Sequence, residues 1–141
     1  MQCRDVMSVP VGTCRLDTQV ADCGRMMSAL DIGCVPVLDY QDRLAGMVTA
    51  RDLAERVVGE GRSPDTQVSV VMSTALVTCS PEDSLRTAED QMRANHTSRV
   101  LVVDRQRHLL GVLSVRDIAP VEPPERSAAL FMAVKAPRHT R

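Results

Sequence analysis

Two copies of one seven-residue motif carry the side chains best suited to ligand chemistry. The copies are Gly46–Asp52 and Gly111–Asp117, and both follow the pattern Gly-x-x-[Thr/Ser]-x-Arg-Asp. Each copy places a hydroxyl, a guanidinium and a carboxylate within four residues. The hydroxyl and guanidinium suit a phosphate, whereas a carboxylate accepts two hydrogen bonds from a ribose diol. The pattern therefore predicts a nucleotide site, formed by Thr49, Arg51 and Asp52 in one copy and by Ser114, Arg116 and Asp117 in the other.

The hydroxyl residues stand where an apolar strand is expected to end and a helix to begin. The first amide groups of a helix lack intrahelical partners and carry partial positive charge, so we expect them to hold an anion. The same spacing also fits a capping box, in which the hydroxyl and the acid three residues later only stabilise the helix start. The sequence leaves both interpretations open.

A nucleotide base would need an apolar slot beside each motif, with its edge bonded to backbone groups. The second copy offers the basic Arg99 where the first has Cys34, so we expect it to prefer a phosphorylated ligand. The residues expected to line the two slots are Val11, Thr13, Val35 and Pro36 in the first copy, and Val77, Thr78, Arg99 and Val100 in the second.

Other chemistry finds little support. The five cysteines include no C-x-x-C pair, and the three histidines lack metal-ligand spacing, so no metal or required cofactor is expected. The sequence contains no P-loop, dinucleotide-binding, metalloprotease or nucleophile-elbow motif, and we predict no enzymatic activity. A thiol-based redox sensor centred on Cys14, whose repeat equivalent is Cys79, stays open as an alternative.

The composition excludes some classes of binding partner. The net charge is −1 and aromatic residues make up 1% of the 141 residues, which argues against duplex or single-stranded nucleic acid. No apolar run reaches the ~18–20 residues needed to span a membrane, and the N-terminal residues do not resemble a signal peptide. We therefore expect a cytoplasmic protein without a membrane partner.

The strongest signal is an internal repeat. An offset of 65 residues aligns residues 6–53 with residues 71–118 without a gap. Neither copy alone could bury much core, so two copies of one supersecondary unit are expected to pack together. The sequence predicts repeats over residues 5–60 and 68–119, followed by a proline-rich linker and short helix over residues 120–141.

Each copy is predicted to fold in the order strand, helix, strand, strand, helix. Helical spacing of apolar residues indicates a helix that begins at Asp17 or Thr18 and ends at Gly33, and its counterpart begins at Ser80-Pro81-Glu82-Asp83. The final helix of the first copy should run from Thr49 to about Val58 and close at Gly59. The predicted strands are Val11–Cys14, Cys34–Leu38, Arg43–Val48, Arg99–Val103 and His108–Leu113.

The tail beyond the repeats is predicted to form a short helix over Ser127–Lys135. Its apolar residues Leu130, Phe131 and Val134 must be covered, either by the chain's own module or by a partner. Both alternatives stay open.

These features resemble tandem CBS-domain proteins, or Bateman modules, of the stand-alone bacterial type. The resemblance covers about residues 5–120. It depends on the two seven-residue motifs, on Val6-Met7-Ser8 and Val71-Met72-Ser73, and on Val35–Asp39 and Val100–Asp104.

The resemblance implies an α+β fold, a CBS pair of two β-α-β-β-α repeats packed sheet to sheet about a pseudo-twofold axis. It also implies clefts between the repeats that bind AMP, ADP, ATP or S-adenosylmethionine, and a homodimer. With no effector domain in the sequence, such a sensor would act on an effector protein in trans. A scaffold dimer with vestigial clefts is the alternative.

Overall fold

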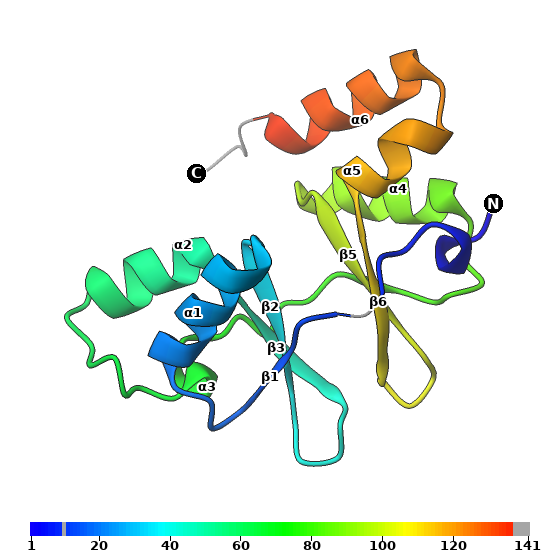
Figure 1. Cartoon of the computed structure of the whole chain (residues 1–141). Coiled ribbons are helices and arrows are strands. Elements are labelled where there is room, and N and C mark those ends of the chain that lie inside the picture. Colours follow the sequence, from blue (N-terminus) through cyan, green and yellow to red (C-terminus); the bar gives the residue numbers. More distant parts are fainter. Residues whose placement is uncertain (10, 137–141) are drawn as a thin grey trace. The chain divides into compact units, whose positions relative to one another are not determined.

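The protein is described by a computed structural model that covers residues 1–9 and 11–136 (Figure 1). The chain divides into two compact units. The first unit is Gly12–Leu76. The second unit combines Val77–Arg141 with the N-terminal segment Met1–Val11. No helix in the described residues is long and apolar enough to cross a membrane.

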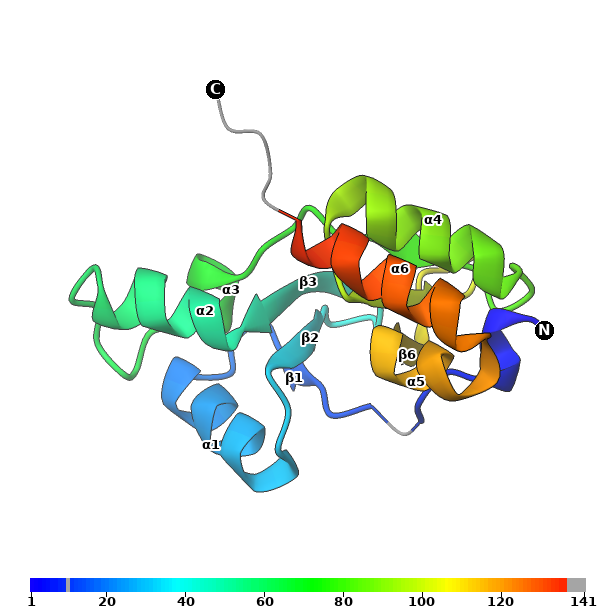
Figure 2. The ribbon, with the colours of Figure 1, turned by 90° about the horizontal axis from the view of Figure 1, so that it is seen from above.

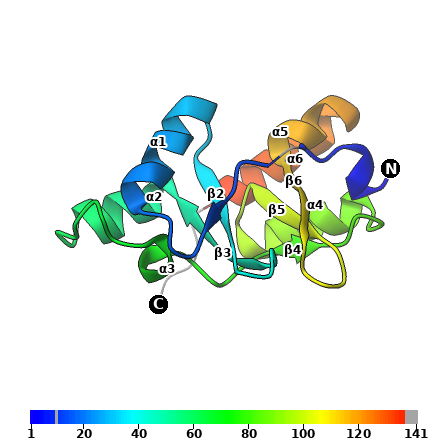
Figure 3. The same cartoon turned by 60° about the horizontal axis from the view of Figure 1, so that its bottom comes forward.

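The first unit contains a three-stranded sheet in the order β1-β2-β3. Strand β1 runs parallel to β2, and β2 and β3 form an antiparallel hairpin (Figure 3). Its elements are β1 (Cys14–Arg15), α1 (Val20–Leu30), β2 (Cys34–Leu38), β3 (Leu44–Thr49), α2 (Ala50–Asp52), the π-helical η2 (Leu53–Val58) and α3 (Val68–Val71).

The second unit repeats this arrangement with the sheet order β4-β5-β6. It adds a 3-10 turn from the N-terminal segment and a helix after the repeat. Its elements are η1 (Cys3–Asp5), β4 (Thr78–Cys79), α4 (Leu85–Asn95), β5 (Arg99–Val103), β6 (Leu109–Ser114), α5 (Val115–Ile118), η3 (Ala119–Val121) and α6 (Pro124–Lys135). The α+β pair of repeats predicted from the sequence is confirmed.

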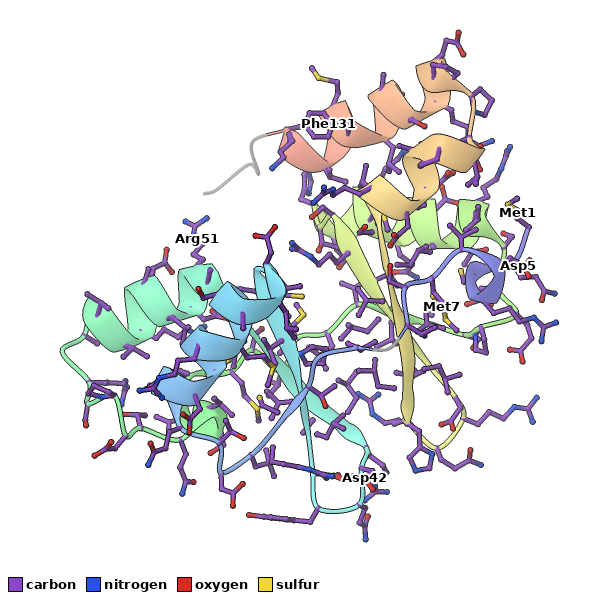
Figure 4. All side chains as sticks on the ribbon, viewed as in Figure 1. Met1, Asp5, Met7, Asp42, Arg51 and Phe131 are labelled. Atoms are coloured by element: carbon purple, nitrogen blue, oxygen red, sulfur yellow. The ribbon has the colours of Figure 1, made fainter. Side chains whose placement is uncertain are left out.

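The sequence repeats and the compact units do not coincide, because each unit binds the segment that precedes the other repeat. Ser73 pairs with Met47 on β3 of the first unit, and Ser8 pairs with Val112 on β6 of the second. Met7 lies beside β6 (Figure 4). Each repeat therefore begins in one unit and continues in the other.

Glycine at positions 46 and 111 permits this close approach. A Cβ atom at Gly46 would lie 2.5 Å from Met72 Sδ and 3.0 Å from the Ser73 carbonyl oxygen. At Gly111 the corresponding distances, to Met7 Sδ and Ser8 O, are 2.6 and 3.1 Å. The glycine that begins each seven-residue motif therefore leaves room for a segment from far away in the sequence. We call these segments, Met7–Ser8 at Gly111 and Met72–Ser73 at Gly46, the crossing segments.

Several predicted element ends were wrong. Helix α1 begins at Val20 behind Gln19, and its left-handed cap is Asp31, with φ 53°, so Gly33 lies beyond the helix. Helix α4 begins at Leu85, where the Ser84 side chain accepts a hydrogen bond from Thr87 N. Residues 80–83 form a turn, in which Ser80 N donates to Asp83 Oδ2, so Ser80 and Pro81 precede the helix start.

Other predicted ends shift by a few residues. The first strand covers Cys14–Arg15, later than the predicted Val11–Cys14, and β3 and β6 each begin and end one residue later than predicted. The helix after Thr49 does run to Val58, with Gly59 as its cap in a right-handed conformation at φ −63°.

The tail helix packs on the chain's own second unit. Helix α6 begins at Pro124, three residues earlier than predicted, and lies alongside α4 (Figure 2). Leu130 is fully buried and Val134 nearly so, whereas half of Phe131 is exposed. Leu130 and Val134 are therefore covered by the chain's own second unit, which is one of the two alternatives predicted for the tail.

A buried ion pair also joins α4 to α6. The Glu89 carboxylate is 1% exposed, and its Oε2 lies 2.9 Å from Arg126 Nη2. Burial and the nearby Glu122 raise the pKa of Glu89, while Arg126 opposes the shift. Glu89 therefore holds a proton more tightly in the folded chain than in the unfolded chain.

We expect Gly46→Ala to lower the free energy of unfolding by about 1–3 kcal/mol, because the new methyl group displaces Met72 and the Ser73 backbone. Gly24→Ala is the matched control. Gly24 lies within α1, and a Cβ there would meet Leu53 Cδ1 at an ordinary 3.8 Å. Because alanine favours a helix more than glycine does, this variant should stabilise the chain by about 0.5–1 kcal/mol. Urea unfolding measures both variants, and equal effects would contradict the close-approach role.

We expect Glu89→Gln to change how stability depends on pH. A folded-state pKa above the ordinary 4.5 means that Glu89 stabilises the protonated fold, and this contribution fades as pH rises through the folded pKa. The wild-type chain should therefore gain stability relative to the Gln variant as pH falls from 7 through the folded pKa toward the ordinary 4.5. A pH-independent difference between their urea unfolding free energies would refute the raised pKa.

Candidate functional site

The hydroxyl and the acid of the first motif form a reciprocal cap at the end of β3. Thr49 Oγ1 accepts a hydrogen bond from Asp52 N at 3.0 Å, and Asp52 Oδ2 accepts one from Thr49 N at 2.9 Å. The Asp52 side chain is 15% exposed, and its Oδ1 lies 3.8 Å from Arg56 Nε. The carboxylate is thus fixed at the surface, with acceptor sites left on Oδ1.

The second motif forms the same cap at the end of β6, but its acid is more fully engaged. Asp117 Oδ2 accepts hydrogen bonds from Ser114 N at 2.9 Å and from Ser114 Oγ at 3.0 Å. Asp117 Oδ1 accepts a third from Ser8 Oγ at 3.0 Å. Ser8 arrives on the crossing N-terminal segment, so that segment contributes to this site.

The expected anion site at the helix amides is only partly available. Ala50 N donates to Gly33 O at 2.9 Å, and Val115 N donates to Ser98 O at 3.0 Å. The third amide of each helix donates to the cap hydroxyl. Two of the first three amides are therefore already engaged, so a phosphate would depend on side chains.

The two arginines of the motifs lie at the surface. Arg51 projects outward from the start of α2 (Figure 4), and its Nε donates to Glu55 Oε1 at 2.7 Å. Glu55 raises the pKa of Arg51, which keeps the guanidinium charged. Arg116 is likewise exposed. Each arginine could turn toward a bound anion at little cost, since exposed ion pairs are weak.

The predicted slot residues fall into two groups. Val35 and Val100 are fully buried in the hydrophobic cores of their units, so their side chains pack the core and only their backbone groups remain for a ligand. Pro36 is also buried. The residues that stay partly exposed are Val11, Thr13, Val77, Thr78 and Arg99.

The residues of the second-unit slot adjoin one another. Leu101 N donates to Val77 O at 3.0 Å, which joins the chain before β4 to β5. Arg99 begins β5 opposite Ser114, the cap residue, in the antiparallel register. The equivalent pairing in the first unit sets Cys34 opposite Thr49. Strand pairing therefore brings the start of the central strand to the motif in both units.

Sequence reasoning missed Ser8 and Arg56 as neighbours of the two acids. The repeated Val-Met-Ser triplet marked Ser8 as a repeat position, but not which unit it would join. Arg56 has Val121 as its repeat equivalent, and its Nη1 also donates to Val71 O at 3.0 Å. The two sites thus differ in the group that approaches the acid.

Within the described residues, no group of three or more His, Cys, Asp or Glu side chains is arranged to hold a metal ion. The motif residues offer hydroxyl, guanidinium and carboxylate groups, and no thiol or imidazole lies among them. The arrangement therefore suits reversible binding of a polar organic ligand through hydrogen bonds.

Comparison with known proteins gives one consistent match. The family model for the CBS domain matches residues 3–59 and 68–121. The CBS domain-containing protein YhcV of Bacillus subtilis is 36% identical over 116 residues, which cover 82% of this chain and 81% of that protein.

Two solved structures share the fold. Hypoxic Response Protein I, solved with two coordinated zinc ions, superposes with a TM-score of 0.78 at 26% identity, over 87% of this chain and all of that one. The CBS domain pair of protein MJ0100, solved with 5′-methylthioadenosine and S-adenosyl-L-methionine, gives a TM-score of 0.76 at 20% identity, over 86% and 94% of the chains.

We expect Asp52→Ala to lower the ligand-free unfolding free energy by about 1 kcal/mol, because Thr49 N loses its acceptor and the helix loses its capping box. Glu55→Ala is the control, since its carboxylate is exposed and, in the described part of the chain, pairs with Arg51 alone. It should change stability by less than about 0.5 kcal/mol. Urea unfolding without nucleotide measures both. An Asp52→Ala variant as stable as the control would show that the cap does not stabilise the fold.

Proposed function

We propose, from the premise that this chain belongs to the CBS domain family and carries two of its repeats, that it is a regulatory module for adenosine-containing ligands. The observation that carries the proposal is the pair of partly exposed carboxylates, Asp52 and Asp117, each fixed by a cap at the end of a strand. The fold shared with the MJ0100 pair, which was solved with two adenosine compounds, supports the same ligand class.

The acid of each motif suits the ribose. A diol donates two hydrogen bonds, and a carboxylate has about four lone-pair positions. Within the described residues, Asp52 accepts one hydrogen bond and Asp117 accepts three. The site at Asp52 therefore has the greater spare acceptor capacity, and we propose it as the stronger ribose site.

The phosphate would be bound by the side chains beside the acid. Arg51 can exchange its exposed Glu55 partner for a phosphate, and the Thr49 hydroxyl hydrogen can add a second donor. In the second unit Arg116 and the half-buried Arg99 take these roles, while the Ser114 hydroxyl already donates to Asp117. The candidate ligands are AMP, ADP, ATP and S-adenosylmethionine, whose methionine carboxylate would take the place of phosphate at the arginine.

The base is expected to lie against the chain before β1 or β4 and the start of the central strand. Backbone groups there would bond its edge, with Val11, Thr13 and Pro36 as neighbours in the first unit and Val77, Thr78 and Arg99 in the second. Because Val35 and Val100 face the cores, they would contribute backbone groups only.

The module is proposed to act without catalysis. Ligand binding would shift the balance between conformations, and a separate effector protein in trans would respond to that shift. We further propose a homodimer in the cytoplasm as the working form.

We expect adenosine nucleotides to raise the melting temperature of the chain. A ligand at 100 times its Kd stabilises the fold by about 2.7 kcal/mol. Asp52→Asn should reduce this ligand-induced shift more than Asp117→Asn. The amide oxygen of Asn can still accept from the cap amide, but one ribose acceptor is lost. Thermal unfolding with AMP, ADP, ATP, S-adenosylmethionine and NAD measures the shifts.

Two controls sharpen this test. Asp42→Asn changes an exposed hairpin acid and should leave the ligand-induced shift intact. With adenosine as an additional compound, Arg51→Ala should reduce the difference between the shifts caused by AMP and by adenosine, and it should leave the adenosine shift unchanged. If none of the five compounds changes the melting temperature, the sensor proposal fails and the scaffold alternative takes its place.

A further inference from the structure

Each unit places two thiols together in its core, and the second thiol comes from a different element in each. In the first unit Cys14 on β1 and Cys23 on α1 are both buried, and the Cys23 thiol raises the pKa of Cys14. In the second unit the equivalent strand residue, Cys79 on β4, hydrogen bonds with Cys3 of the N-terminal segment at an Sγ–Sγ distance of 3.7 Å. Both Cys3 and Cys79 are buried.

The repeat explains why the two pairs differ. At the offset of 65 residues, Cys3 corresponds to Val68 and Cys23 corresponds to Ala88. Each core therefore has the same three packing positions, and a different one carries the second thiol. Only the Cys3–Cys79 pair joins the crossing N-terminal segment to the rest of its unit.

We propose that Cys3 and Cys79 form a reversible disulfide that fixes the N-terminal segment to the second unit. A disulfide requires an S–S distance of about 2.05 Å, so the two sulfur atoms must approach by roughly 1.7 Å. The Cys3 side of the pair can supply this movement, because η1 is a three-residue turn. The turn is bound to residues 81–85 through the backbone of Met1, Cys3 and Arg4 and through the Cys3 thiol, which donates to Ser84 O at 3.7 Å. Cys23, by contrast, lies within the eleven-residue helix α1.

The oxidant is hydrogen peroxide, and the reaction balances in two steps. One thiolate attacks the peroxide O–O bond, becomes a sulfenic acid and releases hydroxide, which takes up a proton to become water. The second thiol then attacks the sulfenic sulfur, the S–S bond forms, and a second water leaves. Two thiols are oxidised and one peroxide is reduced. A dithiol reductant reverses the change by thiol–disulfide exchange.

The closed pair is protected from this reaction until the segment opens. Burial raises the pKa of both thiols, and the nearby Asp83 carboxylate raises them further, so little thiolate forms in the core. When η1 lifts away from β4, water reaches both sulfur atoms and their pKa values return toward the ordinary range. The disulfide therefore records opening of the segment in the presence of peroxide.

The same segment carries Ser8, whose hydroxyl binds the Asp117 carboxylate. A bond at Cys3 would restrict how far this end of the chain can move from β6. Oxidation would thereby favour the arrangement in which Ser8 contacts Asp117. This consequence bears on the proposed ligand site, but disulfide formation itself does not depend on any nucleotide.

The experiment maps the disulfide directly in the full chain. Reduced protein is treated with a small excess of hydrogen peroxide, alkylated, and digested with trypsin. Cleavage after arginine places Cys3 in residues 1–4, Cys14 in 5–15, Cys23 in 16–25 and Cys79 in 63–86. The expected product is residues 1–4 linked to residues 63–86, lighter by two hydrogen atoms than the separate peptides and split again by dithiothreitol.

Two variants taken from the repeat itself serve as matched controls. Cys3→Val introduces the residue found at the equivalent position 68 and should abolish the linked peptide. Cys23→Ala introduces the residue found at position 88 and should leave it unchanged. In the wild-type chain and in Cys23→Ala, oxidation should raise the melting temperature by about 5 °C or more, because the crosslink restricts the unfolded chain.

Three results would overturn the proposal. Cys3 could stay open to alkylation while other cysteines become oxidised. The linked peptide could form only in urea, where the native pair is absent. Oxidised protein that contains the linked peptide could melt no higher than reduced protein, which would show that the bond does not fit the native core.

Discussion

The fold depends on the close contact between a motif glycine and a segment from far away in the sequence. At Gly46 and Gly111 a side chain would collide with a methionine thioether and a backbone carbonyl of the crossing segment. The segment can therefore lie against β3 or β6 only where the strand has no side chain in its path. This contact closes each unit with a piece of chain that precedes the other repeat.

The same strand that accepts the segment also positions the candidate ligand groups. Three residues after Gly46 the strand ends at Thr49, and Gly111 precedes Ser114 by the same spacing. The cap is fixed by its own hydrogen bonds and by the amide of the next residue, which donates to the loop before the central strand. Packing and ligand chemistry thus share one strand, and the motif needs both its glycine and its acid.

The two repeats and the order of their helices and strands could be predicted from the sequence. The 65-residue offset shows the repeat directly, and the spacing of apolar residues within each copy indicates the elements. The exchange of segments could not, since Val6-Met7-Ser8 aligns with Val71-Met72-Ser73 whichever unit each one joins. The start of α4 was misplaced for a local reason. Ser80 and Asp83 satisfy each other in a turn, and Ser84 then offers a second cap closer to the apolar stripe.

The two candidate sites differ in the group that approaches the acid. Several buried positions carry the same residue in both repeats, such as Val35 with Val100 and Val37 with Val102. Of the two groups that approach the acids, Ser8 has an identical repeat equivalent in Ser73, whereas Arg56 has none. Arg56 lies near Asp52 where the second unit has Val121, and Ser8 binds Asp117 through a hydroxyl. A carboxylate beside a cation and one already holding a hydroxyl offer different acceptor strengths to the same ribose, so two repeats of one fold need not bind one ligand equally.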